Sequence, residues 1–199
     1  MPVIKCAEID EHHCLVDAQQ RPSPHYDERP NRELPSVLVI HNITLPPGEF
    51  GHRYIDDLFM GTLDCAAHPF FQQLEGLRVS AHCVINRQGN VSQYVPFDRR
   101  AWHAGVSSFQ GRARVNDFAI GIELEGTDSS GFTSAQYQRL IAITKALMMR
   151  YPTISLGKIV GHCDIAPGRK TDPGVAFDWG YFRSQLSSSG EPIGSNTAV

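Results

Sequence analysis

The sequence predicts an α/β protein, a single domain in which a central mixed β-sheet is flanked by α-helices. Three segments carry this prediction. Residues 37–41 form a continuous apolar run, which is typical of a strand buried on both faces. Residues 118–125 alternate between apolar and other side chains, and residues 133–151 repeat apolar side chains at helical spacing. Because strands and helices do not alternate regularly, a mixed sheet is favoured, and 199 residues suffice for one sizeable core.

The first third of the chain contains two of the predicted elements. Residues 1–20 give no clear signal and form an N-terminal segment of uncertain structure. Residues 21–30 contain three prolines and predict an ordered surface segment without regular structure. The strand at 37–41 ends before a Leu-Pro-Pro-Gly sequence, so its last residue, His41, is expected beside a loop. A short helix is predicted over residues 54–60.

The middle of the chain predicts a hairpin and a third strand. Residues 78–86 form the first arm of the hairpin and residues 91–95 the second, joined by a Gln-Gly-Asn turn. In the strand at 118–125, one face carries Ile120, Ile122 and Leu124, and the other carries Gly121, Glu123 and Glu125.

The last third predicts two helices and a short strand. Thr133 and Gln136 match a capping box at the start of the helix over residues 133–151. Residues 158–161 form a strand that leads into His162, and a last helix begins after Asp178. Residues 187–199 are small and polar, so we expect a disordered tail. The catalytic domain is therefore expected to span residues 21–186.

Composition excludes several classes of protein. A net charge of −3 and the absence of a basic stripe argue against a nucleic-acid partner. No apolar run is long enough to insert into a membrane, and the N-terminus does not resemble a signal peptide. The five cysteines are odd in number and irregularly spaced, which argues against a complete disulfide framework, and the absence of a CxxC pair argues against a structural zinc site. We expect a monomer in a reducing cytoplasm.

Two histidines and an aspartate are the candidate metal ligands. His41 ends the first strand, and His162 and Asp172 lie in a later Gly-rich segment. Taken singly, each residue is more often structural. A histidine at such a position is more often a structural residue with satisfied hydrogen bonds than a metal ligand, and Asp before Pro-Gly is a common turn former. Taken together, two imidazoles and one carboxylate suit a single zinc ion whose fourth position is open to water. The sequence therefore favours a metal-dependent hydrolase.

A hydrolase of this kind also needs a proton carrier and a group that stabilises negative charge. Glu123 or Glu125, which share a strand face, could act as the base, and the pattern alone leaves both open. Lys170 lies two residues before Asp172 and could stabilise an oxyanion. The other histidines rank below the two candidate ligands, although His82 could support one of them; these are His12, His13, His25, His52, His68, His82 and His103.

Long segments of the chain resemble a known enzyme family. They include VIHNITLPPGEF (residues 39–50), YVPFDRRAWHAGVSSF (94–109) and the GIELEGTD stretch (121–128), with shorter matches at 21–27, 78–83 and 161–174. The resemblance is to the zinc amidases that comprise N-acetylmuramoyl-L-alanine amidases, phage amidases and animal peptidoglycan recognition proteins. Within that family, the chain is most similar to the cytoplasmic 1,6-anhydro-N-acetylmuramyl-L-alanine amidases of bacterial cell-wall recycling.

The resemblance implies roles for particular residues. The zinc ligands fall on His41, His162 and Asp172, and the catalytic pair falls on Glu123 and Lys170. The implied reaction is hydrolysis of the amide that joins anhydro-muramic acid to the L-alanine of a stem peptide. The implied substrate contacts are Asn42, Arg78, Trp102, Arg114 and Ala166, with Phe70 at the rim of the site.

Three other functions compete with a recycling amidase. A non-catalytic recognition module typically lacks a zinc ligand, whereas this chain has all three. A phage endolysin or autolysin would act on intact cell wall. A zinc peptidase of another class is disfavoured because the sequence contains no HExxH motif.

Overall fold

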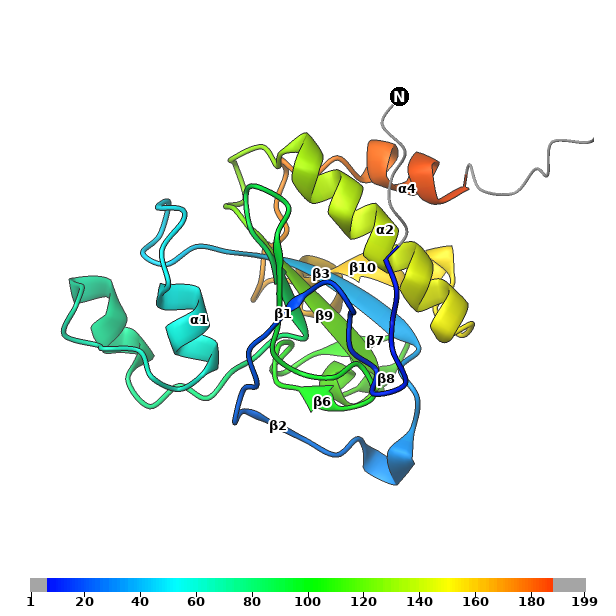
Figure 1. The fold of residues 1–199 in the computed structure, drawn as a ribbon, viewed down its shortest axis with the longest axis horizontal. Coiled ribbons are helices and arrows are strands. Elements are labelled where there is room, and N and C mark those ends of the chain that lie inside the picture. Colours follow the sequence, from blue (N-terminus) through cyan, green and yellow to red (C-terminus); the bar gives the residue numbers. More distant parts are fainter. Residues whose placement is uncertain (1–6, 188–199) are drawn as a thin grey trace, which may run out of the picture.

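The computed structural model describes residues 7–187 and contains one mixed sheet with helices packed against it (Figure 1). The strands are β1 (Gln19–Gln20), β2 (Tyr26–Asp27), β3 (Val37–Ile43), β4 (Cys83–Ile85), β5 (Val91–Gln93), β6 (Arg100–Ala101), β7 (Ser108–Phe109), β8 (Arg112–Ala113), β9 (Ala119–Glu125) and β10 (Ile159–Gly161). The α-helices are α1 (Tyr54–Phe59), α2 (Ser134–Arg150), α3 (His162–Ile165) and α4 (Trp179–Ser187). Short 3-10 helices cover Pro30–Arg32, Pro69–Leu74, Val115–Asp117 and Leu156–Lys158. The predicted α/β class is confirmed.

The main sheet has six strands in the order β1-β5-β4-β9-β3-β10. Strand β9 pairs in parallel with both β3 and β4, and β10 pairs in parallel with β3. Among the described strands of this sheet, the only antiparallel pair is β4 with β5, the predicted hairpin. Parallel strands that lie side by side bring their carboxyl ends to the same edge, which is where ligands bind in open α/β sheets.

The two faces of the sheet are covered differently. Helix α2 lies across one face with α4 beside it (Figure 1). In this layer Leu140, Ile141 and Leu147 of α2 pack against the inward residues of β3 and β9, including Leu38 and Ile122. A smaller cluster on the other face joins strand residues to the loops that precede β9. This double cover explains why β3 and β9 are both buried over nearly their whole length.

The long helix begins where its sequence predicts. The Thr133 side chain accepts a hydrogen bond from the backbone N–H of Gln136, and the Gln136 side chain accepts one from the N–H of Thr133. This is the predicted capping box. The last helix is capped by Asp178, which accepts a hydrogen bond from the Tyr181 N–H.

Two predictions about the first part of the chain are wrong in part. The strand expected over residues 78–86 is only Cys83–Ile85, because the N–H of Ser80 bonds to the Trp102 carbonyl of a neighbouring loop. Residues 21–30 are a surface segment only in part: Pro22, Pro24, Tyr26 and Glu28 are exposed, but Ser23, His25 and Arg29 are buried and Tyr26–Asp27 forms β2. The Arg29 guanidinium donates to four backbone carbonyls that surround the start of β9, those of Phe97, Asn116, Asp117 and Ala119.

Residues 7–20 contribute to the same core. Leu15 is buried in the main cluster, and β1 adds to the sheet edge beside β5. The expected disordered tail lies outside the described residues, apart from Ser187 at the end of α4. Within residues 7–187, no helix combines the length and the apolar character needed to cross a bilayer.

The buried His82 side chain links β9 to the segment before β6 by two hydrogen bonds. Its pKa predicts that the stability of the fold depends on pH. Its Nδ1 accepts a hydrogen bond from the Gly121 N–H, and its Nε2 donates to the Arg99 carbonyl. Burial, with the nearby Arg29 charge, lowers the pKa of His82 to about 3. The hydrogen bond from Gly121 requires a lone pair on Nδ1, so the pair of bonds forms only with the neutral imidazole.

We predict that stability falls as the pH drops below about 6.5, since unfolded His82 then takes a proton that folded His82 refuses. The contribution of this residue approaches about 1.4 kcal/mol per pH unit. Urea unfolding between pH 7.5 and 5 measures it. In His82→Gln, whose amide can make both bonds without titrating, the fall should be shallower, and equal pH profiles would contradict the assignment.

Candidate active site

Three side chains from separate segments meet at the carboxyl ends of β3, β9 and β10. His41 lies near the end of β3, and His162 follows directly after the last residue of β10. Asp172 lies in the loop after α3, where its carbonyl accepts a hydrogen bond from the Cys163 N–H. The predicted trio therefore comes together, although His41 and Asp172 are 131 residues apart in the chain.

The three side chains turn one atom each toward a common point. His41 Nδ1 lies 3.0 Å from His162 Nδ1 and 3.0 Å from Asp172 Oδ2. His162 Nδ1 lies 3.1 Å from the same carboxylate oxygen. Tetrahedral ligands of zinc, at roughly 2.0–2.2 Å from the ion, are about 3.3–3.6 Å apart. The triangle would need to open by only a few tenths of an ångström, and these three residues could hold a metal ion.

The outer nitrogens of both rings also have partners. His162 Nε2 donates to the Ala104 carbonyl at 3.1 Å, which leaves a lone pair on the inward Nδ1. His41 Nε2 lies 2.9 Å from Nδ1 of His103. Metal-binding histidines commonly have such a partner on the nitrogen opposite the ion, because it fixes the ring and its tautomer.

Burial and charge keep His41 and Asp172 in the protonation states that suit cation binding. Burial lowers the pKa of His41 to about 4, despite the opposing hydrogen bond to Asp172, so its ring is neutral at pH 7. Burial alone would raise the pKa of Asp172, but its hydrogen bonds with His162 and His41 reverse the effect and lower it. Two imidazoles and one carboxylate are a donor set of catalytic zinc sites.

Glu123 lies beside the cluster without a hydrogen-bond partner for one of its oxygens. It is paired with His41 across β3 and β9, so the two side chains share a face, and Glu123 Oε1 is 4.0 Å from His41 Nδ1. Its Oε2 is buried and has no hydrogen-bond partner within the described residues. Burial and the neighbouring charge of Asp172 raise the pKa of Glu123 well above its ordinary value. A carboxyl group with a raised pKa binds a proton more strongly than an ordinary one, which suits a group that accepts a proton and returns it.

Glu125 is already used elsewhere. Its carboxylate accepts hydrogen bonds from the backbone N–H groups of Gly51 and Arg87. It lines a different cavity from Glu123, whereas Lys170 lines the same cavity as Glu123. The geometry thus separates the two glutamates that the alternating pattern left equivalent.

A cavity of about 410 Å³ opens over the cluster. Asn42, Phe70 and Trp102 line it, together with the five residues of the candidate metal and catalytic set. Asn42 donates to Asp128 at 2.8 Å, and the Trp102 indole N–H donates to Asp27 at 3.1 Å. Both side chains are therefore held in place at the wall of the cavity.

The other predicted substrate contacts lie outside this cavity. Arg78 lines a small adjoining pocket that shares Leu58, Leu74 and Leu77 with it. Arg114 is largely exposed and pairs with Asp117 at 3.1 Å. Ala166 is buried, its N–H donates to the His162 carbonyl, and its own carbonyl accepts from Arg169 and Lys170.

His103 belongs to the site, although its sequence context ranks it below the two candidate ligands. This residue lines the cavity and contacts His41, yet it lies in a loop after β6, with no periodic pattern around it. The sequence does hold one signal, namely the glycine at position 121. A Cβ there would lie only 2.4 Å from Cγ of His103, so the bare backbone makes room for this ring.

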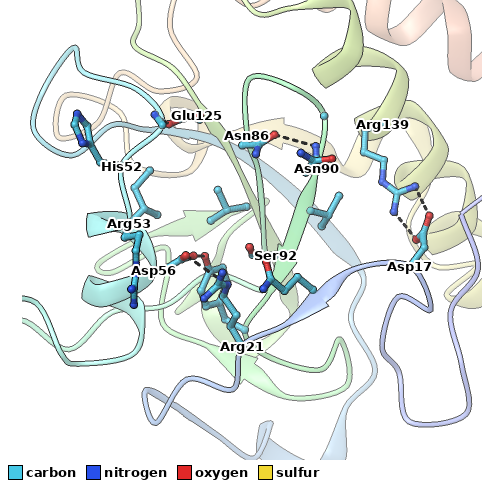
Figure 2. A pocket seen from close by; sticks show the side chains of 17 residues that line it. Asp17, Arg21, His52, Arg53, Asp56, Asn86, Asn90, Ser92, Glu125 and Arg139 are labelled. Atoms are coloured by element: carbon cyan, nitrogen blue, oxygen red, sulfur yellow. Dashed lines mark hydrogen bonds and ion pairs between the residues drawn. The ribbon is translucent and has the colours of Figure 1, made fainter.

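A second cavity, of about 620 Å³, lies toward the β1 edge of the sheet (Figure 2). Two arginines that line it are paired with aspartates that also line it. Arg139 forms a two-pronged ion pair with Asp17, and Arg21 lies 3.4 Å from Asp56. In the first cavity, by contrast, the nitrogen and oxygen atoms of His41, His162 and Asp172 converge on one point where a cation could bind.

The fold and the site together define a hydrolase whose active site could hold a metal ion. The chain belongs to the N-acetylmuramoyl-L-alanine amidase family, whose sequence pattern matches residues 30–175. The predicted family and enzyme class are confirmed.

Individual relatives agree with this placement. The 1,6-anhydro-N-acetylmuramyl-L-alanine amidase AmpD of Escherichia coli K12 is 64% identical over 173 residues, covering 87% of this chain and 94% of that protein. The crystal structure of a selenomethionine AmpD derivative superposes with a TM-score of 0.87 at 61% identity, covering 88% of this chain and 98% of the other. The AmiD amidase from E. coli, in complex with anhydro-N-acetylmuramic acid-L-Ala-D-γ-Glu-L-Lys, has a TM-score of 0.57 at 30% identity, covering 89% of this chain and 65% of the other.

Proposed function

We propose that the protein hydrolyses the amide bond between 1,6-anhydro-N-acetylmuramic acid and the L-alanine of a stem peptide, in peptidoglycan recycling. The observation that carries the proposal is the convergence of His41, His162 and Asp172 to within 3.1 Å beside Glu123, one of whose carboxyl oxygens has no hydrogen-bond partner among residues 7–187. The names of the AmpD relatives support this choice of substrate.

One zinc ion per chain is the proposed cofactor, held by His41, His162 and Asp172. When bound, zinc supplies a Lewis acid that polarises a carbonyl group and makes water nucleophilic at neutral pH. The neutral state of His41 and the ionised state of Asp172 favour this ion, because each then offers a lone pair to it.

Glu123 is the proposed proton carrier. It removes a proton from the attacking water and delivers it to the alanine nitrogen as the C–N bond breaks, so the products are a carboxylic acid and an amine. Its buried position supports this role, because a raised pKa allows it to hold the proton between the two steps. Lys170, which lines the same cavity, is proposed to stabilise the negative charge on the carbonyl oxygen.

Substrate binding is proposed to use the cavity above the cluster. Trp102 offers a flat ring to the sugar, and the His25 ring stacked behind it at 6.1 Å fixes its plane. Asn42 is proposed to bind the peptide backbone, and Phe70 to line the rim. Arg78 and Arg114 remain predicted contacts for stem-peptide carboxylates. Ala166 remains a prediction as well, although its own backbone groups are already engaged.

A bacterial cytoplasmic location is part of the proposal. Four cysteines of the described residues, Cys14, Cys65, Cys83 and Cys163, are free thiols, which suits a reducing compartment. The expectation of a monomer stays a prediction.

The first test is product identification. We predict that the purified protein splits a synthetic anhydro-muramyl peptide into the free sugar acid and a peptide with a new L-alanine N-terminus, as measured by mass spectrometry. Intact sacculi serve as the comparison substrate. Release of peptides from sacculi without turnover of the soluble compound would favour an endolysin or autolysin, and cleavage of neither would favour a recognition module.

The second test concerns the metal. We predict that a chelator abolishes activity and that stoichiometric zinc restores it, because the three ligands enclose a single site. Metal analysis of the active protein should give one zinc ion per chain. A His41→Ala variant should bind zinc far more weakly, whereas His68→Ala, which alters only a cap of the 3-10 helix Pro69–Leu74, should bind it normally. Full activity of a metal-free preparation would refute the zinc mechanism.

The third test separates proton transfer from metal binding. We predict that Glu123→Gln retains zinc but lowers kcat by roughly 10²–10⁴-fold, since the amide cannot accept the proton of water. Glu125→Gln is the matched control on the same strand face. The Glu125 carboxylate accepts hydrogen bonds from Gly51 and Arg87 and does not face the cluster. This change should therefore lower the free energy of unfolding and leave kcat nearly unchanged. A greater loss of turnover in Glu125→Gln would reassign the base.

A further inference from the structure

His103 contacts the outer nitrogen of His41. Its Nδ1 lies 2.9 Å from His41 Nε2, and the two rings meet edge to face with centroids 5.0 Å apart. The proposed metal ligand His162 has a backbone carbonyl, that of Ala104, in the equivalent place. A carbonyl can only accept a hydrogen bond, whereas an imidazole nitrogen can either accept or donate.

The ring of His103 is held in place by its surroundings. Its backbone N–H donates to Asn116 Oδ1 at 3.1 Å, which fixes the start of the side chain. Its ring packs on the bare backbone of Gly121, where a Cβ would come within 2.4 Å of Cγ. The far nitrogen, Nε2, is buried and has no hydrogen-bond partner in the part of the chain that the structure describes. Within that part, the one hydrogen bond of this ring is therefore the bond to His41.

A buried polar ring with a single bond needs a reason, because burying an unpaired N–H or lone pair costs free energy. Packing alone does not supply one, since an apolar side chain would fill the same space without that cost. The bond to His41 does. When His103 Nδ1 accepts from His41 Nε2–H, the proton of His41 stays on the outer nitrogen, and the lone pair stays on the Nδ1 that faces His162 and Asp172.

We propose that His103 is a positioning residue, which orients the His41 ring and keeps its Nδ1 available to the metal ion. The inference rests on the proposed zinc site. It assigns no contact with the substrate to His103, so its main consequence is for metal affinity rather than for the chemical step.

The test measures zinc affinity directly, by competition with a chromophoric chelator, on the wild type, His103→Leu and His103→Asn. Leucine fills the space but cannot accept a hydrogen bond, so we expect the dissociation constant of zinc to rise roughly 10–100-fold. The side-chain oxygen of asparagine can take the place of Nδ1 as acceptor, so we expect His103→Asn to recover most of that loss. Cobalt substitution adds a spectroscopic readout, because a reoriented His41 alters the visible bands.

Two further variants separate this role from folding. Gly121→Ala keeps the imidazole but displaces its ring, and should weaken zinc binding in the same direction as His103→Leu. His25→Leu removes another buried histidine near the cavity, one that bonds to the Val79 carbonyl and not to His41, and should leave zinc affinity unchanged. Thermal unfolding of each metal-free variant shows that it is folded. If His103→Leu does not fold, Gly121→Ala and His103→Asn decide the question.

The outcomes are distinct. Unchanged zinc affinity in His103→Leu, or in a folded Gly121→Ala, overturns the inference while leaving the proposed zinc site intact. Equal losses in His103→Asn and His103→Leu also overturn it, since the shape of the ring and not its acceptor would then matter. Failure of the wild type to bind zinc removes the proposed function itself.

Discussion

The parallel pairing of β3 with its two neighbours is the constraint on which the site depends. The register sets His41 opposite Glu123 and Gly161 opposite Ile40. His162, the next residue after Gly161, therefore begins level with His41. A shift of one residue in either pair would turn the side chain to the other face of the sheet. The cluster exists because the register places His41, Glu123 and the residue that follows β10 at one level, and the buried apolar residues of β3 and β9 fix that register.

Burial then determines the chemistry of the side chains that the register brings together. The same loss of water that lowers the pKa of His41 raises that of Glu123, so the ring stays neutral and the carboxyl group holds its proton more strongly. Asp172 escapes this trend because two imidazoles bond to its carboxylate. One environment thus produces a cation-binding trio and a proton carrier within 4.0 Å of each other.

Sequence patterns identify the parts of the fold that have a period. The apolar run of β3, the alternation of β9 and the capped stripe of α2 all have local signals, and all three elements lie where those signals predict them. The segment around Arg29 has no such signal. Its burial depends on four carbonyls from segments distant in the chain, and the guanidinium can bond to them only after the chain has folded. Likewise, β1 is too short to show a period, and it forms because an edge strand is available.

The residues of the site likewise fall into those that the sequence predicts and one that only the structure reveals. His41, His162, Asp172 and Glu123 stand at predicted strand ends or in a segment of marked composition, so the amino-acid sequence alone relates their types and positions to one chemistry. His103 stands in an irregular loop, and only its neighbours reveal its place: the bare backbone of Gly121 beneath it and the outer nitrogen of His41 in front of it. Direct ligands must be particular residue types, which a sequence displays. The residue behind a ligand need only offer an acceptor in the right place, and a backbone carbonyl does this for His162. Because many groups can meet that requirement, such support leaves little trace in sequence and has to be found in the geometry.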